Sequence, residues 1–249
     1  MKRYLLDLLS VGKMIVPGPE VFWMKHFQED FPLNLWVGLI RGHGRTILVN
    51  TGCSLEWAKQ YGMTEVREDG IVKQLEKLGV LPTDVTDVVV TPFQAYAISN
   101  LMAFEQATIH LSKKGWIDFH APRWHKHPHD IRERCIPPEV LTYLVGTAWH
   151  RVRLLEEDDE ICEGVHTFWT GAHHRSSVAV KIETNKGTAI LSDAMFYVEN
   201  VTERHPLGIN ESMEECLIAY ERIAHTADII LPLYDPRSKS LYEQALLSN

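Results

Sequence analysis

Short apolar runs alternate along the first half of the chain with stretches of helical periodicity. Residues 35–40 and 46–50 form two such runs, and the glycine-rich turn at 41–44 between them predicts a pair of neighbouring strands. The β-branched run 87–91 is typical of a buried strand. Residues 70–79 place apolar side chains on one helical face and end at a glycine, as an amphipathic helix does.

The second half of the chain repeats this alternation. Residues 178–184 and 188–192 predict two strands joined by the hairpin turn Asn185-Lys186-Gly187, and residues 213–224 predict a helix with one apolar face. Paired strands in both halves, with helices between them, favour an α+β fold in which two sheets pack face to face under outer helices. Further strands are expected at 108–111, 165–170 and 229–232, and further helices at 137–147 and near the end of the chain.

The composition is that of a globular domain and narrows the possible partners. The 249 residues are 45% hydrophobic and 23% charged, with net charge -8, and we expect residues 1–249 to form one domain. The acidic balance argues against nucleic-acid binding, and no apolar stretch reaches the roughly 20 residues that span a membrane. The four cysteines lie far apart without CxxC spacing, which predicts reduced thiols in a cytoplasmic protein.

Five short segments contain the candidate functional residues, and their order along the chain is informative. They are Ile47–Gly52, Asp87–Thr91, Thr170–His173, Leu191–Ala194 and Leu233–Pro236. Their order and spacing resemble the metallo-β-lactamase superfamily, in particular its lactonase-like branch of acyl-homoserine-lactone hydrolases, over roughly residues 30 to 236. The resemblance implies a four-layer αββα sandwich with two metal ions held at one edge, between the sheets.

The family's first metal motif, His-x-His-x-Asp-His after a strand that ends in threonine, is altered in this chain. Pro92 and Gln94 stand where the first two histidines belong, and Tyr96 and Ala97 stand for the Asp-His pair. Proline and alanine offer no side-chain ligand, and a tyrosine binds a metal only as phenolate, against a reference pKa near 10. The motif therefore lacks its ligands, although Asn100, which the family places after it, is present.

The remaining ligand positions are also depleted. Asn50 replaces the aspartate of the family's Asp-Thr-Gly turn and Tyr234 replaces the last histidine, so only His173 and the would-be bridging Asp193 remain. A dinuclear hydrolytic site needs several imidazoles and carboxylates to hold its cations and to lower the pKa of bound water. We therefore expect no dinuclear zinc centre and no cofactor, or at most one zinc, iron or manganese ion through His173 and Asp193.

The surviving and substituted residues suggest a remodelled site. His173 and Asp193 are expected to face each other as a general base and its orienting group, or to form only an inherited hydrogen bond. Tyr96 and Tyr234 are expected to enter the same pocket, as proton donors or as filling for the vacated metal volume. Gln94 is expected to hold a substrate carbonyl or to act as a structural amide.

Three further side chains complete the candidate set. Asn50 is a candidate for substrate binding at the turn that it occupies. Arg175 is expected to pair with a substrate carboxylate, with a surface ion pair as the alternative. His174 follows His173 directly, and on a strand or tight loop it is expected to point elsewhere.

Two other stretches invite attention. His125, His127 and His129 would share one side of an extended segment and offer three nitrogens to a metal, but they follow a proline-bearing loop, so solvated histidines are the simpler interpretation. The aromatic stretch 17–31 is expected to pack in the core, with a pocket wall or a dimer face as alternatives. A homodimer is suggested only by analogy.

The leading functional hypothesis is a hydrolase-like enzyme that acts on a small lactone, ester or related carbonyl compound. An enzyme should keep an accessible cavity and a short contact between His173 and Asp193. The alternative is a non-catalytic member that binds a ligand or partner, in which Tyr96 and Tyr234 should close the pocket. A conventional dinuclear hydrolase would need ligands from residues 120–129 to reach the site.

Overall fold

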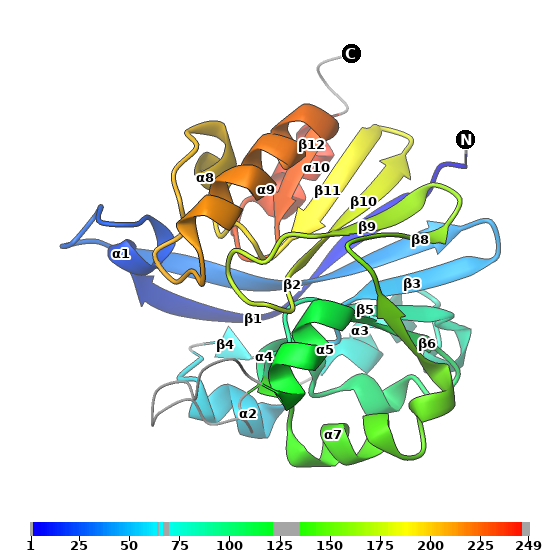
Figure 1. Ribbon diagram of the computed structural model, residues 1–249. Coiled ribbons are helices and arrows are strands. Elements are labelled where there is room, and N and C mark those ends of the chain that lie inside the picture. Colours follow the sequence, from blue (N-terminus) through cyan, green and yellow to red (C-terminus); the bar gives the residue numbers. More distant parts are fainter. Residues whose placement is uncertain (1, 64, 67–69, 122–134, 246–249) are drawn as a thin grey trace.

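Two β-sheets packed face to face form the centre of the molecule (Figure 1). The computed structural model describes residues 2–63, 65–66, 70–121 and 135–245. A seven-stranded sheet has the strand order β4-β1-β2-β3-β5-β6-β7, and a five-stranded sheet has the order β12-β11-β10-β9-β8. None of the helices in the described ranges is both long and apolar enough to span a membrane.

The larger sheet is antiparallel where β1, β2 and β3 pair and parallel from β3 through β5 and β6 to β7. The smaller sheet is antiparallel except for the parallel pair β11 and β12. The strands of the larger sheet are β1 Leu5–Pro17, β2 Asp30–Gly42, β3 Arg45–Val49, β4 Glu65–Val66, β5 Asp87–Val90, β6 Thr108–Ser112 and β7 Val152–Leu155. Those of the smaller sheet are β8 Asp158–Cys162, β9 Val165–Trp169, β10 Val178–Thr184, β11 Gly187–Ser192 and β12 Ile229–Pro232.

Helices cover the outer faces of both sheets, which gives the αββα sandwich that the sequence predicts (Figure 1). Helix α9 buries Cys216, Tyr220 and Ile223 in a cluster with Phe168 and Ile190 of the smaller sheet. The helices are α1 Gly18–Val21, α2 Leu55–Gln60, α3 Gly70–Lys77, α4 Ala95–Ile98, α5 Lys113–His120, α7 Pro138–Val145, α8 Val198–Thr202, α9 Met213–Thr226 and α10 Ser238–Gln244.

The inner faces of the sheets meet closely at one point, where β2 has no side chain. A Cβ atom at Gly38 would lie 2.7 Å from Leu191 Cδ2 of β11, so glycine lets the leucine side chain pack directly on the backbone of β2. The inner faces around this contact carry side chains that are inaccessible to water, among them Ile40, Val89 and Val180. Burial of these aliphatic side chains holds the two layers together.

The N-terminal strand was not predicted, although it is one of the two longest. Asp7, Ser10 and Lys13 interrupt its apolar pattern, and the pairing of β1 with β2 shifts register between Ser10 and Gly12, as at a β-bulge. The aromatic stretch that follows is only partly in the core. Phe22 is 6% exposed, but Trp23 is 43% and Phe27 67% exposed, so the expectation of core packing is wrong for those two residues.

The ends of five strands meet at one edge of the sandwich and position the candidate residues. The segments that follow β3, β5, β9, β11 and β12 all contain site residues predicted from the sequence. Two backbone hydrogen bonds join the sheets there, from Asn34 N to Tyr234 O at 2.9 Å and from Trp36 N to Leu233 O at 3.1 Å. In α/β sheets, the carboxyl ends of strands are the usual place for ligands.

Candidate functional site

A cavity of about 210 Å³ opens at this edge of the sandwich. Its apolar lining comes mainly from β1 and β2, with two side chains from the opposite segments. The polar lining comes from phenols, an amide, imidazoles and one carboxylate, so the cavity combines a mostly apolar surface with a few polar groups, as small-molecule sites do. The apolar side chains are Met14, Val16, Leu33, Leu35, Phe196 and Ile209.

Four residues predicted to share a pocket, Gln94, Tyr96, His173 and Tyr234, all line this cavity. The Tyr234 hydroxyl donates to the Tyr96 hydroxyl at 3.3 Å, and the two rings meet edge to face with centroids 6.1 Å apart. Burial raises the pKa of both tyrosines well above the usual value. Both phenols therefore stay protonated near neutral pH, and because the Tyr234 hydrogen is donated to Tyr96, it is the Tyr96 hydrogen that is available to the cavity.

The amide of Gln94 belongs to a second polar contact on the same wall. The Tyr61 hydroxyl donates to Gln94 Oε1 at 3.1 Å, and Gln94 Nε2 lies 3.7 Å from Cys135 Sγ. The Tyr61 ring also meets the Tyr96 ring edge to face, with centroids 5.4 Å apart. Tyr61 was not predicted from the sequence, because it follows a short helix and belongs to no recognisable motif.

His173 is held as a neutral imidazole with a defined tautomer. Its Nδ1 lies 2.9 Å from the carbonyl oxygen of Ile209, and because a carbonyl only accepts, Nδ1 carries the hydrogen. Burial lowers the pKa of His173 to about 4, so the ring is uncharged at neutral pH. Within the described residues Nε2 forms no hydrogen bond, so its lone pair can accept a proton or a hydrogen bond.

Asp193 lies beside the cavity but does not line it, and its partners are not those expected. Its two carboxylate oxygens accept hydrogen bonds from the hydroxyls of Thr91 and Ser177. Those hydroxyls in turn accept from the backbone amides of Val178, at 2.9 Å, and His174, at 3.0 Å. In the part of the chain that the structure describes, no hydrogen bond joins Asp193 to His173. Burial raises the pKa of Asp193 to about 6, despite the two hydroxyl donors.

Asn50 and Arg175 are both engaged outside the cavity. The Asn50 side-chain amide forms two hydrogen bonds with the backbone of Thr91. It donates to the Thr91 carbonyl at 2.6 Å and accepts from the Thr91 amide at 2.8 Å. Asn50 is buried and has a φ of 68°, a left-handed conformation that asparagine tolerates. Arg175 forms ion pairs with Glu211 and Glu215 and covers the Trp169 ring, which matches the alternative of an ion pair.

The sequence prediction for His174 is wrong, because this residue also lines the cavity. Its ring lies against that of His173, with centroids 4.0 Å apart. The segment after Thr170 is a loop with positive φ at Gly171 and Ala172, so the alternation of a strand does not apply to it. Phe196, another lining residue that was not predicted, contacts the rings of His173 and Tyr234 at 5.0 and 4.9 Å between centroids.

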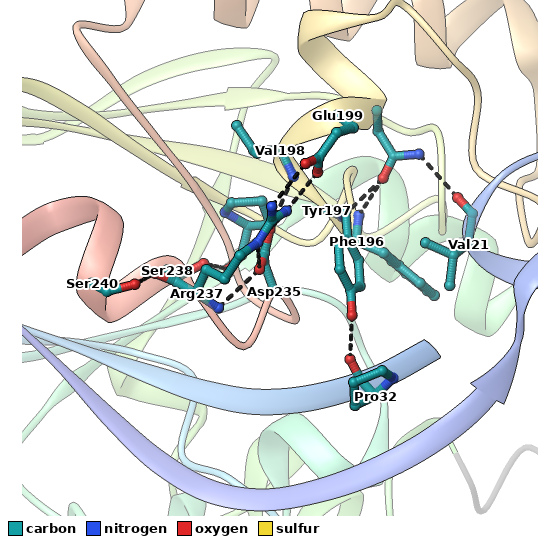
Figure 2. A network of polar contacts seen from close by, with 12 residues as sticks. Val21, Pro32, Phe196, Tyr197, Val198, Glu199, Asp235, Arg237, Ser238 and Ser240 are labelled. Atoms are coloured by element: carbon teal, nitrogen blue, oxygen red, sulfur yellow. Dashed lines mark hydrogen bonds and ion pairs between the residues drawn. The ribbon is translucent and has the colours of Figure 1, made fainter. Parts of the chain in front are cut away.

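A polar network joins Asp235 and Arg237 to the segment that follows Phe196 (Figure 2). The Arg237 guanidinium donates to the fully buried Asp235 carboxylate at 2.8 and 2.9 Å and to Glu199 at 2.8 Å. Asp235 also accepts from the Val198 amide at 3.1 Å. Since Asp235 follows Tyr234 directly and Val198 lies two residues after Phe196, these bonds tie the two wall segments together.

The residues at the family's ligand positions do not fit a dinuclear zinc centre. Pro92 and Ala97 have no donor atom, and the raised pKa of Tyr96 and Tyr234 opposes the phenolate form that a metal would bind. A metal ion on Asp193 would have to displace two hydroxyl donors. Among the residues that the structure describes, no group of three or more His, Cys, Asp or Glu side chains is arranged to hold a metal. The prediction for His125, His127 and His129 concerns residues outside the described ranges.

Solved structures of hydrolases share this fold. A quorum-quenching N-acyl homoserine lactone lactonase matches with a TM-score of 0.78 and 20% identity, over 96% of this chain and 95% of its own. An N-acyl homoserine lactone hydrolase, with the product N-hexanoyl-L-homoserine bound at its catalytic metal center, matches with a TM-score of 0.77 and 20% identity, over 96% and 95%. A probable metal-dependent hydrolase from Staphylococcus aureus has a TM-score of 0.73 and 15% identity, over 97% and 95%.

These likenesses show that the chain has the metallo-β-lactamase fold and that its structural neighbours are lactonases and other hydrolases of that fold. At 20% identity or less they show the fold alone. No protein-family model matches the sequence, and no curated protein matches it either.

Proposed function

We propose that this chain, which has the metallo-β-lactamase fold, is a hydrolase of small, mainly apolar esters or lactones that works without a dinuclear zinc centre. One observation carries the proposal, namely that Tyr96, Tyr234, Gln94 and His173 converge in a single mostly apolar cavity. The hydrolases among its structural neighbours support the reaction class by analogy. A carbonyl compound suits a cavity that offers neutral donors and one free imidazole nitrogen.

His173 is the general base in this proposal. The Ile209 carbonyl fixes the hydrogen on Nδ1, so Nε2 accepts a proton from a water molecule as the water oxygen bonds to the substrate carbonyl carbon. The same nitrogen then returns the proton to the leaving alkoxide as the carbon–oxygen bond of the ester breaks. Since the pKa of His173 is about 4, it is a weak base at neutral pH, and we expect slow turnover.

Tyr96 and Tyr234 stabilise the oxyanion. The Tyr234 hydroxyl already donates to the Tyr96 hydroxyl, so the hydrogen of Tyr96 is available to the carbonyl oxygen of a substrate. The negative charge that develops on this oxygen strengthens the hydrogen bond in the transition state. Gln94, held by Tyr61, orients the acyl group. Arg175 and Asn50 have no part in this proposal, because their polar groups are engaged elsewhere.

A second candidate is ligand binding without turnover. Asp193 is bonded to Thr91 and Ser177, so it does not orient His173, and the base lacks the partner that raises basicity in most hydrolytic sites. The contact between Tyr96 and Tyr234 is also what a pocket closed by its tyrosines should show. This arrangement favours a binding protein if the chain proves inactive.

The test is hydrolysis of short-chain p-nitrophenyl esters and γ-lactones by tag-free protein treated with a chelator. We expect slow turnover, lost in His173→Asn and reduced about 10²-fold in kcat in Tyr96→Phe, the usual effect of removing one oxyanion donor. Asparagine can still donate to the Ile209 carbonyl, so His173→Asn removes the base while keeping the hydrogen bond.

The matched control is His225→Ala, which removes an exposed histidine of α9. It should turn over substrate at the wild-type rate. Equal activity in wild type and His173→Asn would refute His173 as the base. Binding of these compounds without any turnover would establish the second candidate.

A further inference from the structure

Glu20 of α1 lines the cavity, and no described basic side chain lies against its carboxylate. The side chain is partly buried, and no hydrogen bond or ion pair holds it within the described part of the chain. Burial raises the pKa of this carboxyl group. An acid withdrawn from water without a partner carries a desolvation cost that a ligand can offset.

The backbone around Glu20 is firmly placed, so its position on the cavity wall is built into the fold. The Glu20 carbonyl accepts from the amides of Gly208 and Ile209 at 3.0 and 3.1 Å. A Cβ atom at Gly208 would lie 1.6 Å from the Pro19 carbonyl oxygen, so only glycine permits this contact. Ile209 in turn accepts from His173, which places Glu20 on the same wall as the proposed base.

Among the described residues that line the cavity, none is a permanently charged cation that would balance Glu20. The described lining residues include no lysine or arginine, and His173 is neutral. Two other partly buried glutamates of the chain have guanidinium partners, Glu199 in Arg237 and Glu215 in Arg175. A cation supplied by the ligand would complete the cavity in the same way.

We infer that Glu20 recognises a positively charged amine, so that the ligand is a small apolar carbonyl compound carrying an ammonium group. The inference rests on the proposed function only in placing the ligand in the same cavity. The apolar body lies against Met14, Leu33 and Leu35, the carbonyl meets the phenols, and the ammonium group donates to the Glu20 carboxylate. A ligand carboxylate is disfavoured, because it would meet a like charge.

The test uses three probes of the same chain length, namely hexylammonium, 1-hexanol and hexanoate, with binding measured by titration calorimetry at pH 7.5. A hydrogen bond to a charged group is worth about 1.5–3 kcal/mol, so we expect hexylammonium to bind roughly 10- to 100-fold more tightly than 1-hexanol. Hexanoate should bind most weakly. In Glu20→Gln the preference for hexylammonium over 1-hexanol should fall to about twofold or less, with the affinity for 1-hexanol unchanged.

The matched control is Glu29→Gln, which removes an equal charge from an exposed glutamate that pairs with His26 at 2.8 Å. It should keep the wild-type preference. Equal affinities for hexylammonium and 1-hexanol, a preference that persists in Glu20→Gln, or no binding of any probe would overturn the inference. Because these probes contain no ester, the result is independent of turnover, and a failure of hydrolysis leaves it standing.

Discussion

Asp87 and Asp193 are both buried carboxylates at the ends of central strands, but their surroundings are opposite. Asp87 is 1% exposed and has two basic side chains beside it, His110 at 2.8 Å and Arg45 at 3.1 Å. Asp193 is fully buried and has only the hydroxyls of Thr91 and Ser177. Burial raises the pKa of both carboxyls, but at Asp87 the hydrogen bonds from His110 and Thr86 and the nearby charges reverse the shift.

The difference shows how the partners of a buried carboxylate set its contribution to stability: basic side chains at Asp87 and neutral hydroxyls at Asp193. At Asp193 the pKa rises to about 6, so the buried charge disfavours folding above that pH. This rise in pKa corresponds to about 3 kcal/mol of stability lost at high pH. In the family pattern, metal cations would meet this charge, whereas here two neutral hydroxyls meet it. The fold therefore retains Asp193 as a hydrogen-bonded link between the segments after β5, β9 and β11.

The largest expected loss of stability is that of a substitution at Asp87, the carboxylate with basic partners. Asp87→Asn leaves His110 and Arg45 without their anion, and removing one partner of a buried pair costs about 3–5 kcal/mol. Asp87 has a lowered pKa in the folded state, so its stabilisation is present above the unfolded pKa and is lost as the pH falls through the folded value. Urea unfolding at pH 7.5 and pH 3.5 should show a large deficit that shrinks in acid.

The control for this variant is Asp7→Asn, which breaks a partly exposed pair with Arg41 at 2.7 Å. Exposed pairs contribute about 0–1 kcal/mol, so this variant should unfold almost as the wild type does. Similar losses in both variants would mean that burial does not distinguish the two pairs.

At Asp193 the expected dependence on pH has the opposite sign. Its pKa is higher in the folded state, so wild-type stability falls as the pH rises from the unfolded pKa near 3.9 to about 6. Asp193→Asn carries no such charge. The free energy of unfolding of the variant, relative to that of the wild type, should therefore rise by about 3 kcal/mol between pH 4 and pH 8. His173 titrates in both proteins, so the difference cancels its contribution.

Urea unfolding of chelator-treated wild type and Asp193→Asn across this range provides the measurement. A difference that does not change with pH, or that changes in favour of the wild type, would mean that the hydroxyls of Thr91 and Ser177 outweigh burial and keep the pKa of Asp193 low in the folded protein. Such a result would also break the contrast with Asp87.

The pattern of apolar and polar residues predicted much of the fold, but it did not predict the strands whose residues depart from that pattern. Strands at 178–184 and 229–232 have the bounds predicted from their apolar runs. The strand β8 was missed because it is acidic and lies at a sheet edge, where only Ile161 is buried. A single sequence does not show directly which polar residues will pair with a neighbouring strand at the edge of a sheet.

The site was predictable where a family motif fixes the position along the chain. Gln94, Tyr96 and Tyr234 occupy ligand positions of a known pattern, and the structure places all three in the cavity with His173. Glu20 belongs to no motif and is held at the cavity by the hydrogen bonds of its carbonyl with the amides of Gly208 and Ile209. The partners of Asp193 were missed because hydroxyls such as that of Ser177 are common and become specific only once the sheets are packed.

A smaller effect is expected from removing one of the hydroxyls at Asp193. Ser177→Ala deletes a hydrogen bond to a charged group, worth about 1.5–3 kcal/mol, and leaves the His174 amide without its acceptor. The loss should be larger at pH 8 than at pH 4.5, because Asp193 is charged only above about pH 6. Ser240→Ala, at an exposed serine, is the control for urea unfolding.

Metal removal should have the smallest effect on the free energy of unfolding. It tests most directly whether Asp193, unlike Asp87, has no cation beside it. A resident metal ion at 1,000 times its dissociation constant would stabilise the fold by about 4 kcal/mol. Asp193 is already satisfied by Thr91 and Ser177, so we expect chelation and added zinc to change the free energy of unfolding by less than about 0.5 kcal/mol. The same result should hold in His173→Asn. A shift of several kcal/mol in wild type that is absent in His173→Asn would place a metal ion at His173, and Asp193 would then resemble Asp87 in having a cation beside it.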